Sequence, residues 1–337
     1  MAGEQVIVGI DTGGTANNVT VLTLDGHFLV DGLLEVPSRV TEGPAAAVEA
    51  MLLALDTGLA HVGLDRSAVR AVGLDTPGPA SANGVLSSRG GVNFSGRGWW
   101  GFDIRGALEA AVGLPVHYSN DGNAAALYAH HMHFGAISGH RSSVSAVVGT
   151  GLGGGVIEGG HIVRGAAGMA GELGHVHIPV HDILEPDQPI PVCACGFRGD
   201  SESIASLTGI VNNLLPYWLT RFPGHELTGL TPRDGARRVR GLAEQGDELA
   251  LAIFAQQAKA IGALFTITSN VMDPDAFFVG GGVVEADPSF RDWFVARVAD
   301  ATILRDEQRG TSVIALVPDR DMAGARGAAL DALDRSR

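Results

Sequence analysis

Lysine is almost absent from this chain of 337 residues: Lys259 is the only lysine among 23 basic residues. A Walker A loop needs a lysine between a glycine and Ser or Thr, but Lys259 stands between two alanines. The chain therefore cannot be a standard P-loop enzyme. Acidic residues outnumber basic ones, and the net charge of −14 disfavours non-specific binding to nucleic acid or to an anionic membrane.

Cysteine and long apolar runs are also scarce. Cys193 and Cys195 are the only cysteines, and they lie too close together for a disulfide framework. We find no uninterrupted apolar run of the ~18 residues that a transmembrane helix needs, and the first residues lack the basic region of a signal peptide. We therefore expect a cytoplasmic protein with neither a membrane nor a nucleic acid as partner.

Glycine, in contrast, is abundant: there are 48 glycines, many of them clustered between predicted strands. One pattern occurs twice, in residues 5–30 and in residues 142–164: a strand, a Gly/Thr turn, a strand, a tight turn and a third strand. The chain is long for a single hydrophobic core. The duplication therefore predicts an α/β protein with two similar halves, and a nucleotide could lie between their glycine turns.

The predicted elements follow from this pattern and from the apolar periodicity of the remaining chain. The predicted strands are 5–10, 19–24, 27–30, 69–74, 115–118, 142–148, 156–158, 161–164, 275–279 and 311–317. The predicted helices are 44–59, 102–112, 166–176, 201–222, 231–243, 247–272, 289–301 and 323–333, and a further helix follows residue 121.

The segment from Ser119 to Leu127 places an acidic side chain, Asp121, where a predicted strand gives way to a predicted helix. Open α/β sheets bind their ligands at such strand ends, which makes Asp121 the candidate for the chemical centre. A helix cap is the alternative, since Asn or Asp before an Ala-rich run is a common helix start. The two roles are compatible, because Asn120 or the loop could cap the helix while Asp121 accepts a proton.

Two glycine turns, 11–15 and 149–155, suit phosphate groups, because successive backbone N–H groups form an anion site and Thr hydroxyls add donors. Ordinary hairpin turns are the alternative. Asp11 begins the first turn and could hold Mg²⁺ beside a nucleotide, or it could be a simple turn residue. Phosphoryl transfer to an alcohol needs a proton acceptor, a metal ion and donors to the phosphoryl group. Asp121, Mg²⁺ near Asp11 and the glycine turns would supply them.

A third constellation lies further along the chain. His175, Cys193 and Cys195 with a nearby acid could bind Zn²⁺, although two ordinary loop cysteines are the alternative. Glu172 and Glu202 flank this segment and could accept hydrogen bonds from sugar hydroxyls, or they could be ordinary surface acids.

Two further patterns are weaker evidence for function. The glycines of residues 149–154 formally match the dinucleotide-binding fingerprint, but a strand and not a helix is predicted after them, so we reject that match. His130, His131 and His133 share one predicted helix, and we favour an exposed helix face over a metal site there.

Several motifs occur together and in a characteristic order. They are Asp11-Thr-Gly-Gly-Thr15, Asn120-Asp-Gly-Asn-Ala-Ala125, Gly149-Thr-Gly-Leu-Gly-Gly-Gly155, Glu172-Leu-Gly-His175, Cys193-x-Cys195-Gly196-x-x-Gly199 and Gly280-Gly-Gly282. In this order they resemble the motifs of the ROK (repressor, ORF, kinase) family of sugar kinases, of which bacterial glucokinase is the commonest type. The resemblance covers essentially the whole chain.

The resemblance implies an actin-like, ribonuclease H-like α/β fold with two domains around a cleft. The small N-terminal domain would span 1–118, completed by a C-terminal helix at 321–337, and the large domain would span 119–320. The resemblance also implies ATP with Mg²⁺ as the phosphoryl donor, Asp121 as the general base and frequent homodimers. The expected reaction is phosphorylation of a hexose-like hydroxyl, most simply of glucose to glucose 6-phosphate.

By position, the resemblance assigns roles to further residues. The sugar would be contacted by Asn93, Asn120, Asp121, Glu172, His175 and Glu202. The nucleotide would be lined by Asp11, Gly13, Gly14, Thr15, Thr150, Gly151 and Gly281. A structural zinc ion would be bound by His175, Cys193 and Cys195, with Asp200 as the fourth candidate ligand.

The chain departs from the family pattern in two places. Asp200 stands at the position of the third cysteine, and the stretch between His175 and Cys193 is longer than usual. The segment after Asn93 is also longer, with three residues, 96–98, before a pair of tryptophans. An aminosugar such as N-acetylmannosamine, fructose or a cyclitol is therefore an alternative substrate.

Other functions are weighed against the kinase. A sugar-sensing regulator of the same family needs a helix-turn-helix, and we expect no room for one before the first strand. A non-catalytic binding protein would be expected to lack Asp121 or the glycine turns, and all are present. A polyphosphate donor would need a basic groove, which an acidic chain with one lysine does not favour.

Overall fold

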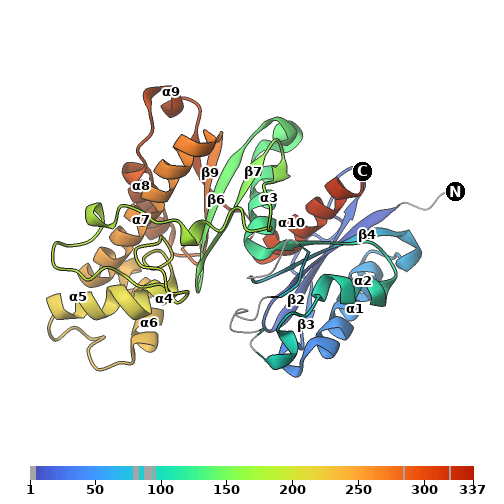
Figure 1. The fold of residues 1–337 in the computed structure, drawn as a ribbon, viewed down its shortest axis with the longest axis horizontal. Helices are drawn as coiled ribbons and strands as arrows, with labels where there is room; N and C mark the ends of the chain where they lie inside the picture. Colours follow the sequence, from blue (N-terminus) through green and yellow to red (C-terminus); the bar gives the residue numbers. More distant parts are fainter. Residues whose placement is uncertain (1–4, 79–82, 87–93, 95, 284, 319) are drawn as a thin grey trace. The chain divides into compact units, whose positions relative to one another are not determined.

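The computed structural model describes residues 5–78, 83–86, 94, 96–283, 285–318 and 320–337. Contacts divide the chain into two compact units (Figure 1). The first unit comprises residues 1–141, 155–171 and 318–337, and the second comprises residues 142–154 and 172–317. This division by contacts does not test the predicted domains, 1–118 with 321–337 and 119–320, which stay a prediction.

The first unit contains a five-stranded sheet with the order β3-β2-β1-β4-β5. β1 pairs antiparallel with β2 and parallel with β4, and β4 pairs parallel with β5. Central strands that are covered on both faces are expected to be apolar throughout, and β1 and β4 are buried along nearly their whole length. The strands are β1 Val6–Thr12, β2 Ala16–Thr23, β3 Glu35–Pro37, β4 Val69–Thr76 and β5 Val116–Asn120.

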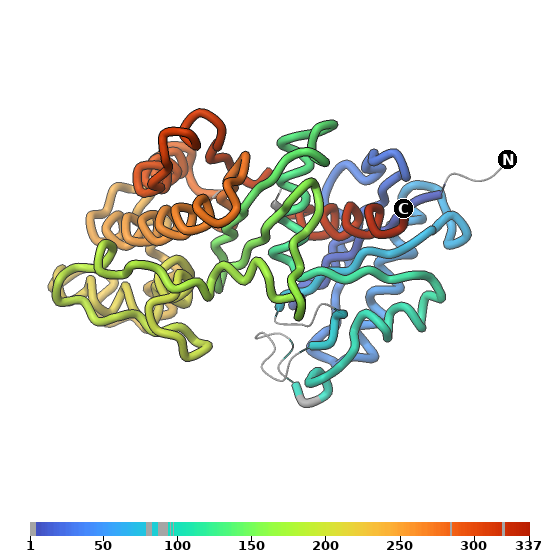
Figure 2. Tube along the Cα trace, turned by 45° about the horizontal axis from the view of Figure 1, so that its top comes forward, coloured from blue at the N-terminus to red at the C-terminus, as the bar shows by residue number. Residues whose placement is uncertain are grey.

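Helices cover both faces of this sheet. The apolar side chains of one face form a core with α1 and α2. The other face packs against α10, which lies along the blue strands in both Figure 1 and Figure 2. The helices are α1 Pro44–His61, α2 Ile104–Val112, α3 Asp121–Phe134 and α10 Arg320–Arg335.

Glycines allow α10 to lie very close to the sheet. A Cβ atom on Gly9 would stand 2.1 Å from the carbonyl oxygen of Ala325, and one on Gly73 would stand 2.0 Å from that of Ala328. Real Cβ atoms do not come so close to backbone, so these two positions exclude every side chain. The last helix of the chain thereby packs directly on the backbone of its first sheet.

The second unit is built around a sheet with the order β10-β9-β6-β7-β8. β9 is parallel to both β6 and β10, while β7 pairs antiparallel with β8. β7 crosses from the second unit into the first after Gly154, and β8 belongs to the first unit. The strands are β6 Ser143–Val148, β7 Leu152–Glu158, β8 His161–Ile162, β9 Ala276–Gly281 and β10 Val313–Leu316.

The helices of the second unit surround one long helix, α7, which packs against α5, α6 and α8. They are α4 Leu207–Gly209, α5 Leu215–Arg221, α6 Pro232–Glu244, α7 Glu248–Met272, α8 Pro288–Ala301 and α9 Asp306–Arg309. α7 corrects one expectation, because its length and composition would suffice to cross a membrane. However, 61% of its most apolar window is buried inside the protein, as in a core helix.

The duplication predicted from the sequence is visible in the strand orders. Numbered within each copy, the strands of the two sheets follow one another in the same way: the first strand is flanked by the second and the fourth, and the third and fifth lie at the edges. In both copies a glycine turn connects the first strand to the second.

Three local predictions are wrong. Residues 27–30 form an isolated bridge from Phe28 to Leu22, and the third strand comes later, at β3. Residues 166–176 form no α-helix, because Gly165, Gly168 and Gly171 adopt positive φ angles that interrupt one. Helical structure expected from residue 201 begins at Leu207, where the Ser206 side chain accepts a hydrogen bond from the N–H of Gly209 and caps it.

The close approach of α10 yields a stability prediction. Gly73→Ala should lower the free energy of unfolding by about 2 kcal/mol or more, because overpacking a dense interface costs about 1–3 kcal/mol and a backbone carbonyl cannot rotate away. Gly32→Ala is the matched control, since no heavy atom lies within 4 Å of the added methyl group. Urea denaturation of both variants measures the difference, and equal stability of the two would contradict the packing described.

Candidate functional site

Asp121 is the first residue of α3 and follows β5 directly. The Asn120 side chain accepts a hydrogen bond from the N–H of Asn123 at 2.8 Å, so Asn120 is the helix cap. The Asp121 carboxylate accepts one from the N–H of Gly122 at 2.7 Å, and the residue is exposed. Because Asn120 supplies the cap, the exposed Asp121 carboxylate is accessible to a ligand.

Asp11 lies near the end of β1, at the start of the first glycine turn. Its carboxylate accepts a hydrogen bond from the Asn18 amide at 3.2 Å. Loss of water around the carboxylate raises the pKa of Asp11. The turn that follows is tight, because the N–H of Gly13 donates to the carbonyl of Ala16 at 2.9 Å, and Thr15 is exposed.

Asp75 is a polar residue in this region that the motifs did not single out. It is the register partner of Asp11 in the parallel β1–β4 ladder and is fully buried. Burial, reinforced by the neighbouring Asp11 and Asp121, raises the pKa of Asp75 well above its usual value. A signal existed in the sequence: Asp75 ends a buried apolar run, as Asp11 does.

In the second unit, residues at the start of α4 form hydrogen bonds to the backbone of the turn that begins at Gly149. The N–H of Leu207 donates to the carbonyl of Gly149 at 3.0 Å, and the N–H and hydroxyl of Thr208 both donate to the carbonyl of Thr150. Thr150 itself is exposed. β7 begins at Leu152, so this turn is shorter than the predicted 149–155.

Glu202 connects this turn to the cysteine segment. One carboxylate oxygen accepts a hydrogen bond from the N–H of Leu152 at 2.9 Å, and the other accepts one from the Cys193 thiol at 3.2 Å. A Cβ atom on Gly151 would lie 2.5 Å from the first of these oxygens, so a side chain there would displace the carboxylate from its present position. One predicted sugar ligand thus contacts both the start of β7, directly after the glycine turn, and the cysteine segment.

The other predicted sugar ligands of this unit lie near Glu202. Burial raises the pKa of Glu172, and the negative charge of Glu202 adds to the effect while His175 opposes it. The structure therefore brings Glu172, His175 and Glu202 into one electrostatic neighbourhood. Asn93, the remaining sugar ligand expected outside the Asn120–Asp121 pair, lies outside the described residues.

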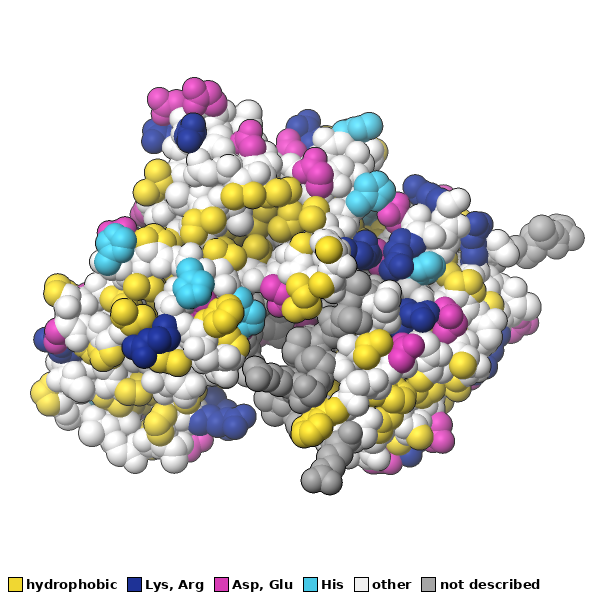
Figure 3. Space-filling model, viewed as in Figure 1, with side chains coloured by type: hydrophobic (Ala, Val, Ile, Leu, Met, Phe, Trp, Pro, Cys, Tyr) yellow, Lys and Arg dark blue, Asp and Glu magenta, His cyan; other side chains and the backbone are white. Residues whose placement is uncertain are grey.

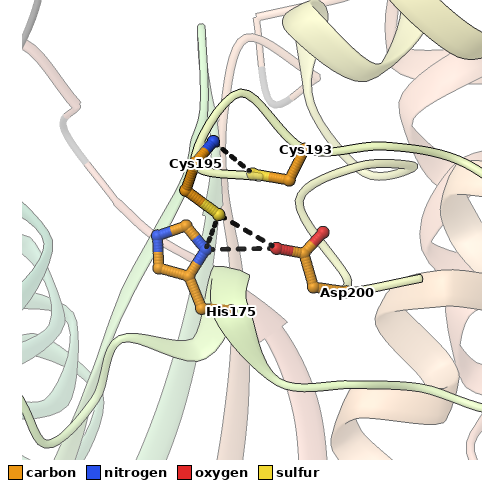
Figure 4. A group of neighbouring side chains, drawn as sticks. All are labelled: His175, Cys193, Cys195 and Asp200. Atoms are coloured by element: carbon orange, nitrogen blue, oxygen red, sulfur yellow. Dashed lines mark hydrogen bonds and ion pairs between the residues drawn. The ribbon is translucent and has the colours of Figure 1, made fainter. Parts of the chain in front are cut away.

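Four side chains of the second unit converge in one cluster, formed by the predicted zinc residues His175, Cys193, Cys195 and Asp200 (Figure 4). Their ligand atoms all lie within 4.8 Å of one another. His175 Nδ1 lies 3.2 Å from Asp200 Oδ2 and 3.7 Å from Cys195 Sγ. One imidazole nitrogen, two sulfurs and one carboxylate oxygen form a donor set that suits tetrahedral Zn²⁺.

Asp200 is fully buried and uses its two oxygens differently. Oδ1 accepts a hydrogen bond from the N–H of Ser203 at 3.0 Å, which orients the carboxylate, while Oδ2 points into the cluster. Burial raises the pKa of the Cys193 thiol. A metal ion would have to displace that proton, since thiolate is the ligand form of cysteine.

Gly281, which the resemblance assigns to the nucleotide site, has a φ of +88°. A Cβ atom there would lie 1.9 Å from the carbonyl oxygen of Val148, so strand packing alone requires glycine.

The exposed face predicted for the α3 histidines is wrong for His130. This residue is buried, and its ring nitrogen Nε2 lies 2.9 Å from the carbonyl oxygen of Ser138.

The comparisons with known proteins agree with this arrangement. The model of the ROK family matches residues 7–335. The glucokinase of Halalkalibacterium halodurans is 31% identical, with 90% of each chain aligned. The N-acetylmannosamine kinase of Shigella flexneri is 29% identical over 83% of this chain and 84% of its own.

Two solved structures have the same fold. A ROK hexokinase from Thermus thermophilus superposes with a TM-score of 0.75 at 29% identity, covering 98% of this chain and 99% of its own. A ROK family glucokinase from Streptomyces griseus, in complex with glucose and AMPPNP, gives 0.69 at 29% identity, covering 97% and 99%. The predicted actin-like α/β fold class is confirmed. The chain belongs to the ROK family, and the predicted enzyme class, an ATP-dependent sugar kinase, is confirmed with it.

Proposed function

We propose that this kinase transfers the γ-phosphoryl group of ATP to the 6-hydroxyl of glucose, with Asp121 as the general base. The observation that carries the proposal is the position of Asp121: an exposed carboxylate at the junction of β5 and α3, whose helix is already capped by Asn120. A base must reach the proton that it accepts, and nothing in the fold of α3 requires this carboxylate for capping.

The reaction needs few groups. The sugar hydroxyl loses its proton to Asp121 as its oxygen attacks the γ-phosphorus, and the bond from that phosphorus to the bridging oxygen of ADP breaks. The backbone N–H groups and hydroxyls of the two glycine turns would bind the phosphates. Asp11 would hold Mg²⁺, which neutralises developing charge on the phosphates when it is bound.

Glucose is the first candidate because two of the relatives named as glucokinases, those of Halalkalibacterium halodurans and Streptomyces coelicolor, match at 31% identity. In addition, Glu172, His175 and Glu202 offer a polar neighbourhood for several hydroxyls. N-acetylmannosamine is the second candidate. It is supported by the relatives at 29% identity that act on it and by the altered cysteine segment, whose members contact Glu202. The same altered segment keeps fructose and a cyclitol as further alternatives.

Zn²⁺ is proposed as a structural ion at the cluster of Figure 4, with Asp200 in place of the family's third cysteine. It would fix the Cys193–Asp200 segment, and through Cys193 it would set the position of Glu202. A homodimer stays a prediction from the family, and a cytoplasmic location stays a prediction from the sequence. Figure 3 shows acidic and basic side chains interspersed on the face drawn. The net charge of −14 supports ATP over a polyanionic donor.

Asp121→Asn should lower kcat by about 10²–10⁴-fold, the usual contribution of a general base, while sugar binding measured by calorimetry stays within a few-fold of the original. Asp56→Asn is the matched control, because it removes an exposed carboxylate of the same unit that pairs with Arg66. Turnover retained by Asp121→Asn would refute the role of the base.

Substrate choice is tested by ATP consumption with glucose, N-acetylmannosamine, fructose and inositol. We expect the highest kcat/KM with glucose and a 6-phosphate product identified by NMR. A higher kcat/KM with another acceptor would overturn the choice of glucose and leave the sugar kinase class intact.

We expect the purified protein to contain zinc and protein chains in equal molar amounts, as measured by elemental analysis. Asp200→Ala should lose most of the zinc, and Asp200→Cys should retain it, because a thiolate restores a fourth ligand. Replacement by Co²⁺ should give a sulfur-to-metal absorption band that is stronger in Asp200→Cys. His177→Ala is the control and should keep its zinc, because the His177 ring contacts Phe197 in a tilted arrangement, with the ring centroids 5.5 Å apart, and is not one of the four cluster residues. A zinc-free wild-type protein would contradict the site.

A further inference from the structure

One segment of the second unit, residues 192–203, carries the predicted sugar ligand Glu202 and three of the four cluster residues drawn in Figure 4. The segment contains isolated bridges but no helix and no strand. It therefore has no backbone ladder of its own that would fix its path, and its backbone groups need partners elsewhere. The position of Glu202 depends on those partners.

Asn213 contacts both ends of this segment with one side-chain amide, an arrangement that we call the Asn213 clamp. Its Oδ1 accepts a hydrogen bond from the N–H of Val192 at 3.2 Å, and its Nδ2 donates to the carbonyl of Val192 at 3.1 Å. Nδ2 also donates to the carbonyl of Ser203 at 2.9 Å. Val192 precedes Cys193 and Ser203 follows Glu202, so one amide joins the backbone beside the first cysteine to the backbone beside the sugar ligand.

Ser203, at one end of the clamp, is buried and tightly packed. Its N–H donates to Asp200 Oδ1 at 3.0 Å, and its hydroxyl donates to the carbonyl of Asp200 at 2.6 Å. A Cβ atom on Gly209 would lie 2.7 Å from the Ser203 carbonyl oxygen, so the start of the next helical segment lies directly against that carbonyl. The clamp is thereby linked through Ser203 to Asp200 as well as to Glu202.

The helical turn that carries Asn213 is irregular. Ile210–Leu214 forms a π-helix between α4 and α5. Pro216, in the first turn of α5, has no N–H to donate to the carbonyl four residues earlier, which favours a departure from regular α-helical hydrogen bonding there. Single π-helical turns inside helices are frequent at functional sites. The irregular turn and the clamp coincide at Asn213.

We propose that Asn213 is a positioning residue for sugar binding, which holds residues 192–203 so that Glu202 meets the acceptor. The inference rests on the role proposed above for Glu202 as a sugar ligand. The glycine turn has separate contacts, because Leu207 and Thr208 donate to its carbonyl groups. Loss of the clamp is therefore expected to weaken the binding of sugar more than the binding of ATP.

The clamp needs an amide, because it uses both N–H bonds and the oxygen of the Asn213 side chain. An aspartate in its place has almost the same size but no N–H group. Its carboxylate would still accept from the N–H of Val192, but it would set a negative charge against the carbonyl oxygens of Val192 and Ser203. Asn213→Asp is therefore a substitution that reverses the clamp with little change in volume.

The first measurement is steady-state kinetics of the full-length protein with whichever of glucose, N-acetylmannosamine, fructose and inositol gives the highest kcat/KM. In Asn213→Asp we expect the KM for the sugar to rise about tenfold or more, while kcat and the KM for ATP stay within about threefold, because a contact made equally before and in the transition state affects KM alone. Asn213→Leu removes the three hydrogen bonds without adding charge and should shift KM in the same direction. Asn212→Asp, at the exposed neighbouring position, is the matched control and should keep the wild-type KM.

The second measurement, alkylation of Cys193, tests the clamp without any turnover. Cys193 is buried and Cys195 is exposed. Zinc-free full-length protein is treated with iodoacetamide, and tandem mass spectrometry distinguishes the two cysteines. We expect Cys193 to react about tenfold or more faster in Asn213→Asp than in the wild type or in Asn212→Asp, because local opening of the segment exposes the thiol.

An unchanged alkylation rate at Cys193, or an unchanged KM for the sugar, would overturn the proposal. A fall in kcat with KM unchanged would indicate partial unfolding instead of positioning and would overturn it as well. The two measurements also separate this proposal from the proposed function. If none of the four acceptors is phosphorylated, the proposed function fails, and the alkylation rate alone decides whether Asn213 holds the segment. If Asp121→Asn retains turnover, the assignment of the base fails and the effect of Asn213→Asp on KM is still expected.

Discussion

The direct contact of α10 with the backbone of β1 and β4 is the constraint on which the first unit depends. Gly9 and Gly73 have no side chain because the carbonyl groups of α10 occupy that space. The contact joins the two ends of the chain and continues past these two glycines, since a Cβ atom on Gly324 would lie 2.8 Å from the carboxyl carbon of Asp11. The packing of α10 therefore also covers the carboxylate near the end of β1.

In the second unit, one carboxylate connects the glycine turn to the cysteine segment. Glu202 receives a backbone N–H from the start of β7 and a thiol from Cys193. A change in the cysteine segment, such as the aspartate at position 200, therefore acts close to the glycine turn and close to the expected sugar ligands at once. In this unit a continuous chain of hydrogen bonds runs from the start of β7 through Glu202 to the cluster of Figure 4.

Much of this could be predicted from the sequence, because strand ends and glycine turns are local features. The strand–helix junction at Asp121 is confirmed by the structure. The four residues that the resemblance assigns to zinc do lie together in space, and their role as zinc ligands stays a prediction. The position of Asp75 directly beside Asp11 was not predicted, because it depends on the pairing of β4 with β1, and the apolar run that ends at Asp75 does not show which strand lies next to it. The helix predicted at 166–176 failed because three glycines with positive φ outweigh an Ala-rich composition.

The repeated strand order has an evolutionary consequence. Asp11 opens the first glycine turn and Gly149 opens the second, so the two copies of the repeat differ at the same point. A duplicated gene would give both copies the same backbone, and the side chains have since diverged. One copy has an acid where its first strand ends, and the other has no side chain there.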